Sequence, residues 1–250
     1  KVWPDSLDAE TSFVGRGDYR EPMFVISDGN DDCISQLLFD SWHMEEDFVI
    51  PQLPNTLNKQ QTLCVVLKDN TRNLQIKMYY SVFPDSDVIV KSCCVTNFGT
   101  QDLWLTRAMS SQIDLPDEGW IVDTLDGAWA RERYINTRPL QDGVTLIDSK
   151  RGISSNTHNS YVVLRRDDST YDNGDAYGIN LVYSGNHAEI LEKTPLGNVR
   201  ILNGINPFDF RWQLRAGESF YTPESTVCYS SHGTNGLTQQ YHRFINDNVV

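Results

Sequence analysis

The chain has 250 residues, of which 34 are acidic and 21 basic, giving a formal net charge of −13. This length suits one large domain, and all-β domains often reach it undivided. The acidic balance excludes a general phosphate-binding surface, because nucleic-acid-binding proteins carry basic patches that release counterions. No apolar run approaches the roughly 18 residues of a membrane-spanning helix. We therefore expect neither nucleic acid nor a membrane as a partner.

Strand-forming segments dominate the first half of the chain. They cover residues 62–69, 74–83, 87–99 and 103–115, and short polar breaks separate them. Residues 74–83 place apolar side chains at every second position from Leu74 to Tyr80, which is the period of a half-buried strand. The breaks carry residues that favour turns, such as Pro84 and Gly99.

The second half repeats this pattern without intervening helices. Its strand-forming segments are residues 161–166, 176–184, 188–194, 198–205, 210–217 and 218–230. Strands that follow one another at such short spacing indicate antiparallel sheets packed face to face. The predicted fold class is therefore all-β.

One helical segment closes the chain. Residues 236–249 place Leu237, Tyr241 and Phe244 at helical spacing, with Thr238 as a candidate N-cap. We therefore divide the chain into a β-domain, residues 1–235, and a helix, residues 236–250, that leads out of it.

The cysteines and histidines do not form the short motifs typical of metal sites. The five cysteines make an odd number without a C-x-x-C pair, and adjacent Cys93 and Cys94 must face opposite sides of a strand. No two histidines have H-x-x-x-H spacing, so we expect neither a metal nor a cofactor. Free thiols and the absence of a signal peptide predict a cytoplasmic protein. A start without methionine suggests a trimmed fragment.

The stretch LDGAWARERYINTRPL, residues 125–140, places a tryptophan and several arginines in an otherwise acidic chain. Trp129 stands between Ala128 and Ala130, which favours a large ring packed beside small neighbours. We therefore expect Trp129 to pack at a crowded surface, as a structural or interface residue, with Arg131 and Arg133 reaching outward to carboxylates of the domain or of a neighbour. Direct contact of Trp129 with a sugar is the alternative.

Several loops carry a resemblance to a known family. The matching patterns are G-x-G-D-[FY]-R-x-P at residues 15–22, L-x-G-A-W-x-R-E-R at 125–133, R-R-G-x-S-S-x-x-x-N at 150–159, [VY]-Y-S-G-N at 182–186, G-I-N-P-x-D-F-x-W at 204–212 and P-G-E-S-F-x-T-P-E at 216–224. Lys150 replaces the first Arg of its pattern, and Ala216 replaces a Pro. With these patterns in this order, the chain resembles the N-terminal β-domain of glycoside hydrolase family 36, the bacterial α-galactosidases.

The resemblance implies a galactose mutarotase-like antiparallel β-supersandwich with a C-terminal helix. It implies a non-catalytic part of a retaining enzyme that removes terminal α-galactosyl residues from oligosaccharides such as raffinose or melibiose. The catalytic residues of the family, among them the Asp of a Lys-Trp-Asp motif, belong to a (β/α)8 barrel. No tryptophan of this chain precedes an Asp. The implied partners are that barrel, neighbouring subunits and, in the full enzyme, a galacto-oligosaccharide.

Residues of three of these loops are candidates for contact with substrate or with a subunit interface. They are Asp18, Arg20, Trp129, Arg131, Arg133, His158 and Asn159. Family members begin with further strands, so we also expect an exposed sheet edge that recruits other chains.

Two other functions remain open. A free-standing carbohydrate-binding module would need an exposed aromatic platform, which Trp104, Trp120 or Trp129 could supply. An aldose 1-epimerase would need a histidine acid and a carboxylate base, and the candidates are His158 or His187 with Glu189 or Glu218.

Overall fold

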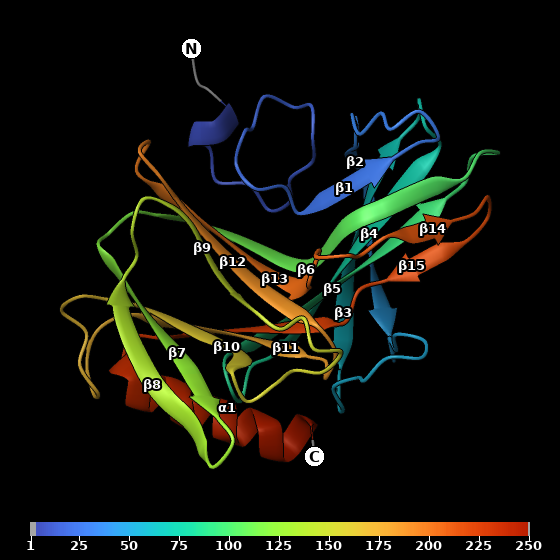
Figure 1. Cartoon of the computed structure of the whole chain (residues 1–250). Helices are drawn as coiled ribbons and strands as arrows, with labels where there is room; N and C mark the ends of the chain where they lie inside the picture. The colour runs from blue at the N-terminus through green and yellow to red at the C-terminus, as the bar shows by residue number, and fades with distance from the viewer. Residues whose placement is uncertain (1–3, 250) are drawn as a thin grey trace.

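Two antiparallel sheets face one another in the computed structural model, which describes residues 4–249 (Figure 1). The smaller sheet has six strands in the order β1-β6-β13-β12-β9, and β14 pairs with β6. Its strands are β1 (Phe24–Ser27), β6 (Leu103–Pro116), β9 (Gly143–Asp148), β12 (His187–Thr194), β13 (Asn198–Ile205) and β14 (Trp212–Leu214).

The larger sheet has ten strands in the order β2-β3-β4-β5-β16-β11-β10-β7-β8, and β15 pairs with β5. Its strands are β2 (Leu38–Glu46), β3 (Gln61–Asp69), β4 (Leu74–Phe83), β5 (Val88–Asn97), β7 (Trp120–Ala128), β8 (Arg131–Pro139), β10 (His158–Arg166), β11 (Ala176–Val182), β15 (Ser219–Tyr221) and β16 (Glu224–Ser230). A short 3-10 helix, η1 (Pro4–Ser6), precedes both sheets. The structure confirms the predicted all-β antiparallel sandwich with a C-terminal helix.

The apolar side chains lie on both faces of the larger sheet. On β10, Val162 and Leu164 join the core between the sheets, whereas Val163 packs with the helix on the outer face. The same alternation separates Cys93, which lies in the inner core, from Cys94, which lies in an outer cluster. The prediction that these two cysteines face opposite sides is confirmed.

The helix α1 (Gly233–Asn248) covers part of the outer face of the larger sheet (Figure 1). Its buried side chains include Leu237, Tyr241 and Phe244, as the helical spacing predicted. Gly178 on β11 allows this approach, because a Cβ there would lie 2.5 Å from the Tyr241 ring. Among residues 4–249, no helix is long and apolar enough to cross a membrane.

The predicted start of the helix is wrong by three residues. The helix begins at Gly233 rather than at residue 236, and the N-cap is His232, whose side chain makes no capping hydrogen bond. Thr238 lies inside the helix, where its hydroxyl donates to the carbonyl oxygen of Thr234 at 2.7 Å. The division of the chain at residue 235 stays a prediction, and residues 1–3 and 250 lie outside the described part.

Candidate functional site

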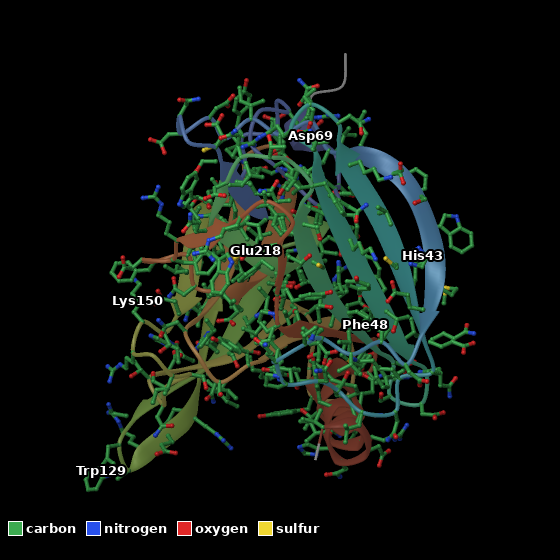
Figure 2. All side chains as sticks on the ribbon, turned by 90° about the vertical axis from the view of Figure 1, so that its right-hand side faces the viewer. His43, Phe48, Asp69, Trp129, Lys150 and Glu218 are labelled. Atoms are coloured by element: carbon green, nitrogen blue, oxygen red, sulfur yellow. The ribbon has the colours of Figure 1, made fainter. Side chains whose placement is uncertain are left out.

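The hairpin of β7 and β8 projects from the sandwich and carries three of the candidate residues. Trp129 stands at its tip (Figure 2) and is 91% exposed. Arg131 and Arg133 on β8 are also exposed, and among the described residues neither forms an ion pair. Their guanidinium groups are therefore free to meet carboxylates or sugar hydroxyls of another molecule.

The prediction that Trp129 is packed is wrong, and the turn explains why. Ala128 pairs with Arg131, so Trp129 and Ala130 form the turn of the hairpin. Ala130 has a φ of 59°, a left-handed conformation that small residues adopt more easily than bulky ones. A Cβ at Gly127 would collide with the backbone of Arg131. The small neighbours therefore serve the turn and leave the indole ring outside the core.

His158 lies on the neighbouring strand β10, opposite Asp126 of β7, which is three residues before Trp129. Its Nδ1 lies 2.8 Å from Oδ1 of Asp126 on β7, and Asn136 donates to the other oxygen of Asp126 at 3.0 Å. Burial alone would raise the pKa of Asp126, but the hydrogen bonds from His158, Asn136 and Thr124 outweigh it and lower this pKa. Asn159, next on β10, is half-buried. Asp126 thus remains a carboxylate that orients the His158 ring.

Asp18 and Arg20 lie in a buried charge cluster, which Arg200 on β13 and Asp114 on β6 complete. Arg20 Nε donates to Asp18 Oδ1 at 2.9 Å, and the Arg20 side chain is almost fully buried. Arg200 Nη2 lies 2.7 Å from one oxygen each of Asp18 and Asp114. Burial would raise the pKa of Asp18, but the hydrogen bonds from Arg20 and Arg200 lower it overall. The cluster clamps the N-terminal loop onto the smaller sheet.

The structure therefore divides the candidate residues into two groups. Trp129, Arg131, Arg133, His158 and Asn159 share one end of the larger sheet, around β7, β8 and β10. The N-terminal loop with Asp18 and Arg20 lies at the opposite end of the molecule (Figure 1). The contacts of Asp18 and Arg20 given above are all with residues of this chain. Direct contact of either residue with a substrate stays a prediction.

Sequence reasoning missed Asp114, Asp126 and Arg200. A signal for Arg200 exists in the sequence, because it is the one charged residue of the otherwise apolar and amide-bearing strand NVRILNGI. A charged side chain in such a strand is buried only if it is paired. The identity of its partners could not be deduced, because Asp18 and Asp114 are 182 and 86 residues away in the chain.

A buried pair of His187 and Glu189 occupies the core side of β12. His187 Nδ1 lies 3.0 Å from Glu189 Oε2, and both side chains are fully buried. Asn203 donates to Glu189 at 2.9 Å, and His187 Nε2 lies 3.2 Å from the carbonyl oxygen of His158. The pair that the epimerase hypothesis names thus exists, but its atoms are enclosed in protein and present no surface to a sugar.

The epimerase hypothesis also pairs His158 with Glu189 or Glu218. In the structure, the carboxylate beside His158 is that of Asp126. Glu189 is the partner of His187, and Glu218 accepts from the backbone N–H of Arg215 in an exposed turn. No open histidine–carboxylate pair of the predicted composition is formed among residues 4–249.

Comparison with known proteins places the chain in a family. The sequence model of the glycosyl hydrolase family 36 N-terminal domain matches residues 1–215. The chain belongs to this family. It is 36% identical over 245 residues, 95% of the chain, to the α-galactosidase AgaA of Geobacillus stearothermophilus. It is 33% identical, over 98% of the chain, to the α-galactosidase Mel36A of Lactobacillus acidophilus.

Solved structures of the family share the fold of this domain. The crystal structure of AgaA superposes with a TM-score of 0.95 over 98% of the chain and 35% of AgaA, at 34% identity. The α-galactosidase of Lactobacillus brevis gives the same TM-score over 99% of the chain and 34% of that protein, at 38% identity. The chain spans about a third of the length of the relatives it matches. It corresponds to a non-catalytic part of such enzymes.

Proposed function

We propose that the chain is the N-terminal β-sandwich domain of a retaining α-galactosidase, which hydrolyses terminal α-galactosyl residues of oligosaccharides such as raffinose or melibiose. The match that carries this proposal is the superposition of 98% of the chain on about a third of AgaA. Structures of AgaA variants hold stachyose and raffinose. The domain would support the catalytic barrel and the oligomer, without carrying out the reaction.

The charge pairing in the domain agrees with a non-catalytic role. Retaining hydrolysis needs two carboxyl groups about 5–5.5 Å apart, one as nucleophile and one as acid/base, on either side of an anomeric carbon. Asp18 and Asp114 do lie together, but both are bonded to Arg200 and buried. A carboxylate held in this way by arginine cannot approach a sugar carbon.

The exposed hairpin supports a contact role toward the rest of the enzyme. Trp129 offers a large apolar face, and Arg131 and Arg133 offer exposed cations beside it. Exposed tryptophan and arginine are the residues that most often dominate the binding energy of interfaces. We propose that this hairpin docks on the barrel or on a neighbouring subunit.

A domain exchange tests the proposed function. AgaA in which this chain replaces the matching third of the sequence should still hydrolyse raffinose, because the two N-terminal domains have the same fold. The remaining two-thirds of AgaA alone should be insoluble or inactive. A soluble, folded chimera without activity would contradict the proposed supporting role.

The isolated chain should show no turnover of aryl α-galactosides above buffer, because binding without a positioned nucleophile stabilises substrate and transition state alike. Aryl β-galactosides and α-glucosides should also remain intact. Turnover that co-purifies with the chain and disappears when one of its carboxylates is replaced would overturn the proposal.

The exposure of Trp129 also favours a second candidate, a carbohydrate-binding module with this ring as its platform. Isothermal titration with galactose and raffinose tests it. Binding that Trp129→Ala abolishes, but that replacement of half-exposed Trp212 leaves intact, would support this function. Absence of heat at millimolar sugar would exclude it, and a mutarotation assay tests the epimerase alternative.

We also propose a cytoplasmic location. The support is that the five cysteines, all within the described residues, form no disulfide. A thiol titration of the denatured, unreduced protein should find five free groups, and a count of three or one would contradict the proposal.

A further inference from the structure

Three side chains of different chemistry converge at the edge of the larger sheet. His43 on β2 lies directly opposite Cys64 on β3, and Glu45 follows His43 on the same face of β2. One ligand atom from each of the three lies within 4.8 Å of the others. His43 Nε2 and Glu45 Oε1 are 3.0 Å apart. Figure 2 shows His43 on this outermost strand.

The strand register creates this cluster. The pairing of β2 with β3 shifts between Phe39 and Ser41, so that Asp40 is an extra residue in β2. From Ser41 onward each residue of β2 has a single partner on β3, and this brings His43 opposite Cys64. Residues in such directly opposed positions have Cβ atoms about 4.5–5.5 Å apart, within joint reach of one metal ion.

We propose that His43, Glu45 and Cys64 form a zinc site with one coordination position open to solvent. Imidazole nitrogen, carboxylate oxygen and thiolate sulfur are the three ligand types that Zn²⁺ takes in proteins. Bond lengths of about 2.0–2.3 Å place tetrahedral ligand atoms about 3.3–3.8 Å apart, close to the spread of this cluster. The His43 side chain is 46% exposed, so water can occupy the fourth position.

The two sides of the cluster differ in polarity. Cys64 is fully buried and packs with Phe48, Ile50 and Tyr79 on the outer face of the sheet. These apolar groups keep water from the sulfur side of the site. His43 and Glu45 border solvent, which gives an ion a path of entry.

Zinc binding would replace the thiol proton of Cys64 and displace the ammonium group of Lys77 from Glu45. The Cys64 thiol loses its proton to solvent as the sulfur–zinc bond forms, so each zinc ion bound releases one proton. Because zinc and the proton compete for the same sulfur, affinity should increase with pH. Lys77 Nζ lies 3.9 Å from Glu45 Oε1 and must swing toward solvent. Its side chain is already 34% exposed, which permits that movement.

The proposed ion would fasten an edge strand. All residues of β2 except Glu45 are exposed, so few buried contacts hold the strand to the sheet. Two of the ligands come from β2 and one from β3, and an ion shared between them joins the strands. Zinc should therefore protect the backbone amides of β2 from hydrogen exchange and raise the melting temperature of the chain.

Cobalt(II) is the probe for this site, because a thiolate ligand gives it a near-ultraviolet charge-transfer band. The metal-free chain should develop this band with one cobalt per chain, and zinc should abolish it by displacement. His43→Ala should weaken binding by about 100-fold or more, since loss of even outer-shell partners costs about 10–100-fold. Cys64→Ser should remove the band. His242→Ala and Cys33→Ser, which alter residues outside the cluster, should leave it unchanged.

If Cys64→Ser fails to fold, His43→Ala still tests the site. The His43 side chain is 46% exposed, so its replacement should leave the fold intact. At a zinc concentration well below the dissociation constant of the variant, zinc should raise the melting temperature of the unaltered chain and leave that of His43→Ala unchanged. Absence of the thiolate band, its persistence in Cys64→Ser, or equal affinity in His43→Ala would overturn the proposal. Binding by acidic surface groups alone would give cobalt uptake without the band, and would overturn it also.

Discussion

Arg200 and Asp18 form an ion pair of 2.7 Å between side chains that are 182 residues apart in the chain. The pair joins the N-terminal loop to strand β13, and the Arg200 side chain is fully buried. Loss of one partner of a buried ion pair leaves the other charge uncompensated, which costs about 3–5 kcal/mol.

Asp18→Asn should therefore lower the free energy of unfolding at pH 7 by about 3 kcal/mol. The folded pKa of Asp18 is lowered, so its contribution is present above the unfolded pKa and is lost as pH falls through the folded value. Urea denaturation should show that the difference from the unaltered chain shrinks below about pH 4. Exposed Asp8→Asn is the control. A difference that is constant down to pH 2 would contradict this role.

Replacement of two tryptophans should have opposite outcomes. Trp129→Ala should change the free energy of unfolding by less than about 0.5 kcal/mol, because the ring is 91% exposed. Trp120→Ala should cost about 3–5 kcal/mol, because that ring is buried and its Nε1 donates to the carbonyl oxygen of Pro116 at 2.8 Å. Chemical denaturation measures both. Equal effects would mean that the hairpin tip packs in solution.

The pair of His187 and Glu189 should make stability fall as pH rises. Burial would lower the pKa of His187, but bonding to Glu189 raises it above 6.5, and burial raises the pKa of Glu189 above 4.5. Each group then holds its proton more tightly in the folded chain, so the stability it contributes is present below its unfolded pKa and is lost as pH rises through its folded pKa. Urea midpoints should therefore fall as pH rises from 4.5, the ordinary pKa of the glutamate, past 6.5, the ordinary pKa of the histidine.

Glu189→Gln provides the control for this pH dependence. The amide keeps a hydrogen-bonding group beside His187 and removes the charge that raises its pKa. NMR titration should find the His187 pKa above 6.5 in the unaltered chain and lower in the variant. A His187 pKa below 6.5 in both proteins would contradict the predicted pH dependence.

Thiol reactivity should separate one cysteine from the other four. Cys33 is half-buried, whereas Cys64, Cys93, Cys94 and Cys228 are buried. Burial raises the pKa of Cys64 and of Cys228 to about 12, which disfavours the reactive thiolate. A thiol reagent should label one group rapidly at pH 8 and all five after denaturation. Cys33→Ser should abolish the rapid phase, and rapid labelling of more than one group would contradict the buried placement.

Several buried strands, such as β4, were predicted from the sequence, whereas β7 and the exposed strands β2 and β8 were not. Residues 74–83 are predicted and observed with the same bounds, because buried Leu74, Ile76 and Met78 alternate with half-buried residues over the first part of the strand. β2 and β8 escape prediction, because nearly all of their residues are exposed and no apolar period marks them. The extra residue Asp40 breaks the alternation of β2 further.

The candidate residues were predictable as a family pattern, but their roles were not. The sequence G-A-W-A lies at the turn of the exposed hairpin, but its small residues suggested that Trp129 is packed. That suggestion was wrong, because small residues occur in tight turns as well as in crowded cores. The clamp of Asp18 by Arg200 and the pairing of His43 with Cys64 depend on strand register. Register is set by the whole sheet, so a local pattern cannot reveal it.

The extra residue in β2 determines where this strand can lose a residue during evolution. Phe39 lies opposite Leu67 and Ser41 lies opposite the adjacent Val66, so Phe39 and Ser41 already face opposite sides of the sheet. Deletion of Asp40 would make these two residues consecutive and leave every other residue of β2 opposite its present partner. Deletion of a residue between Ser41 and Glu46 would instead exchange the faces of part of the strand. Homologues should therefore lack a residue at position 40 more often than at any position from 41 to 46.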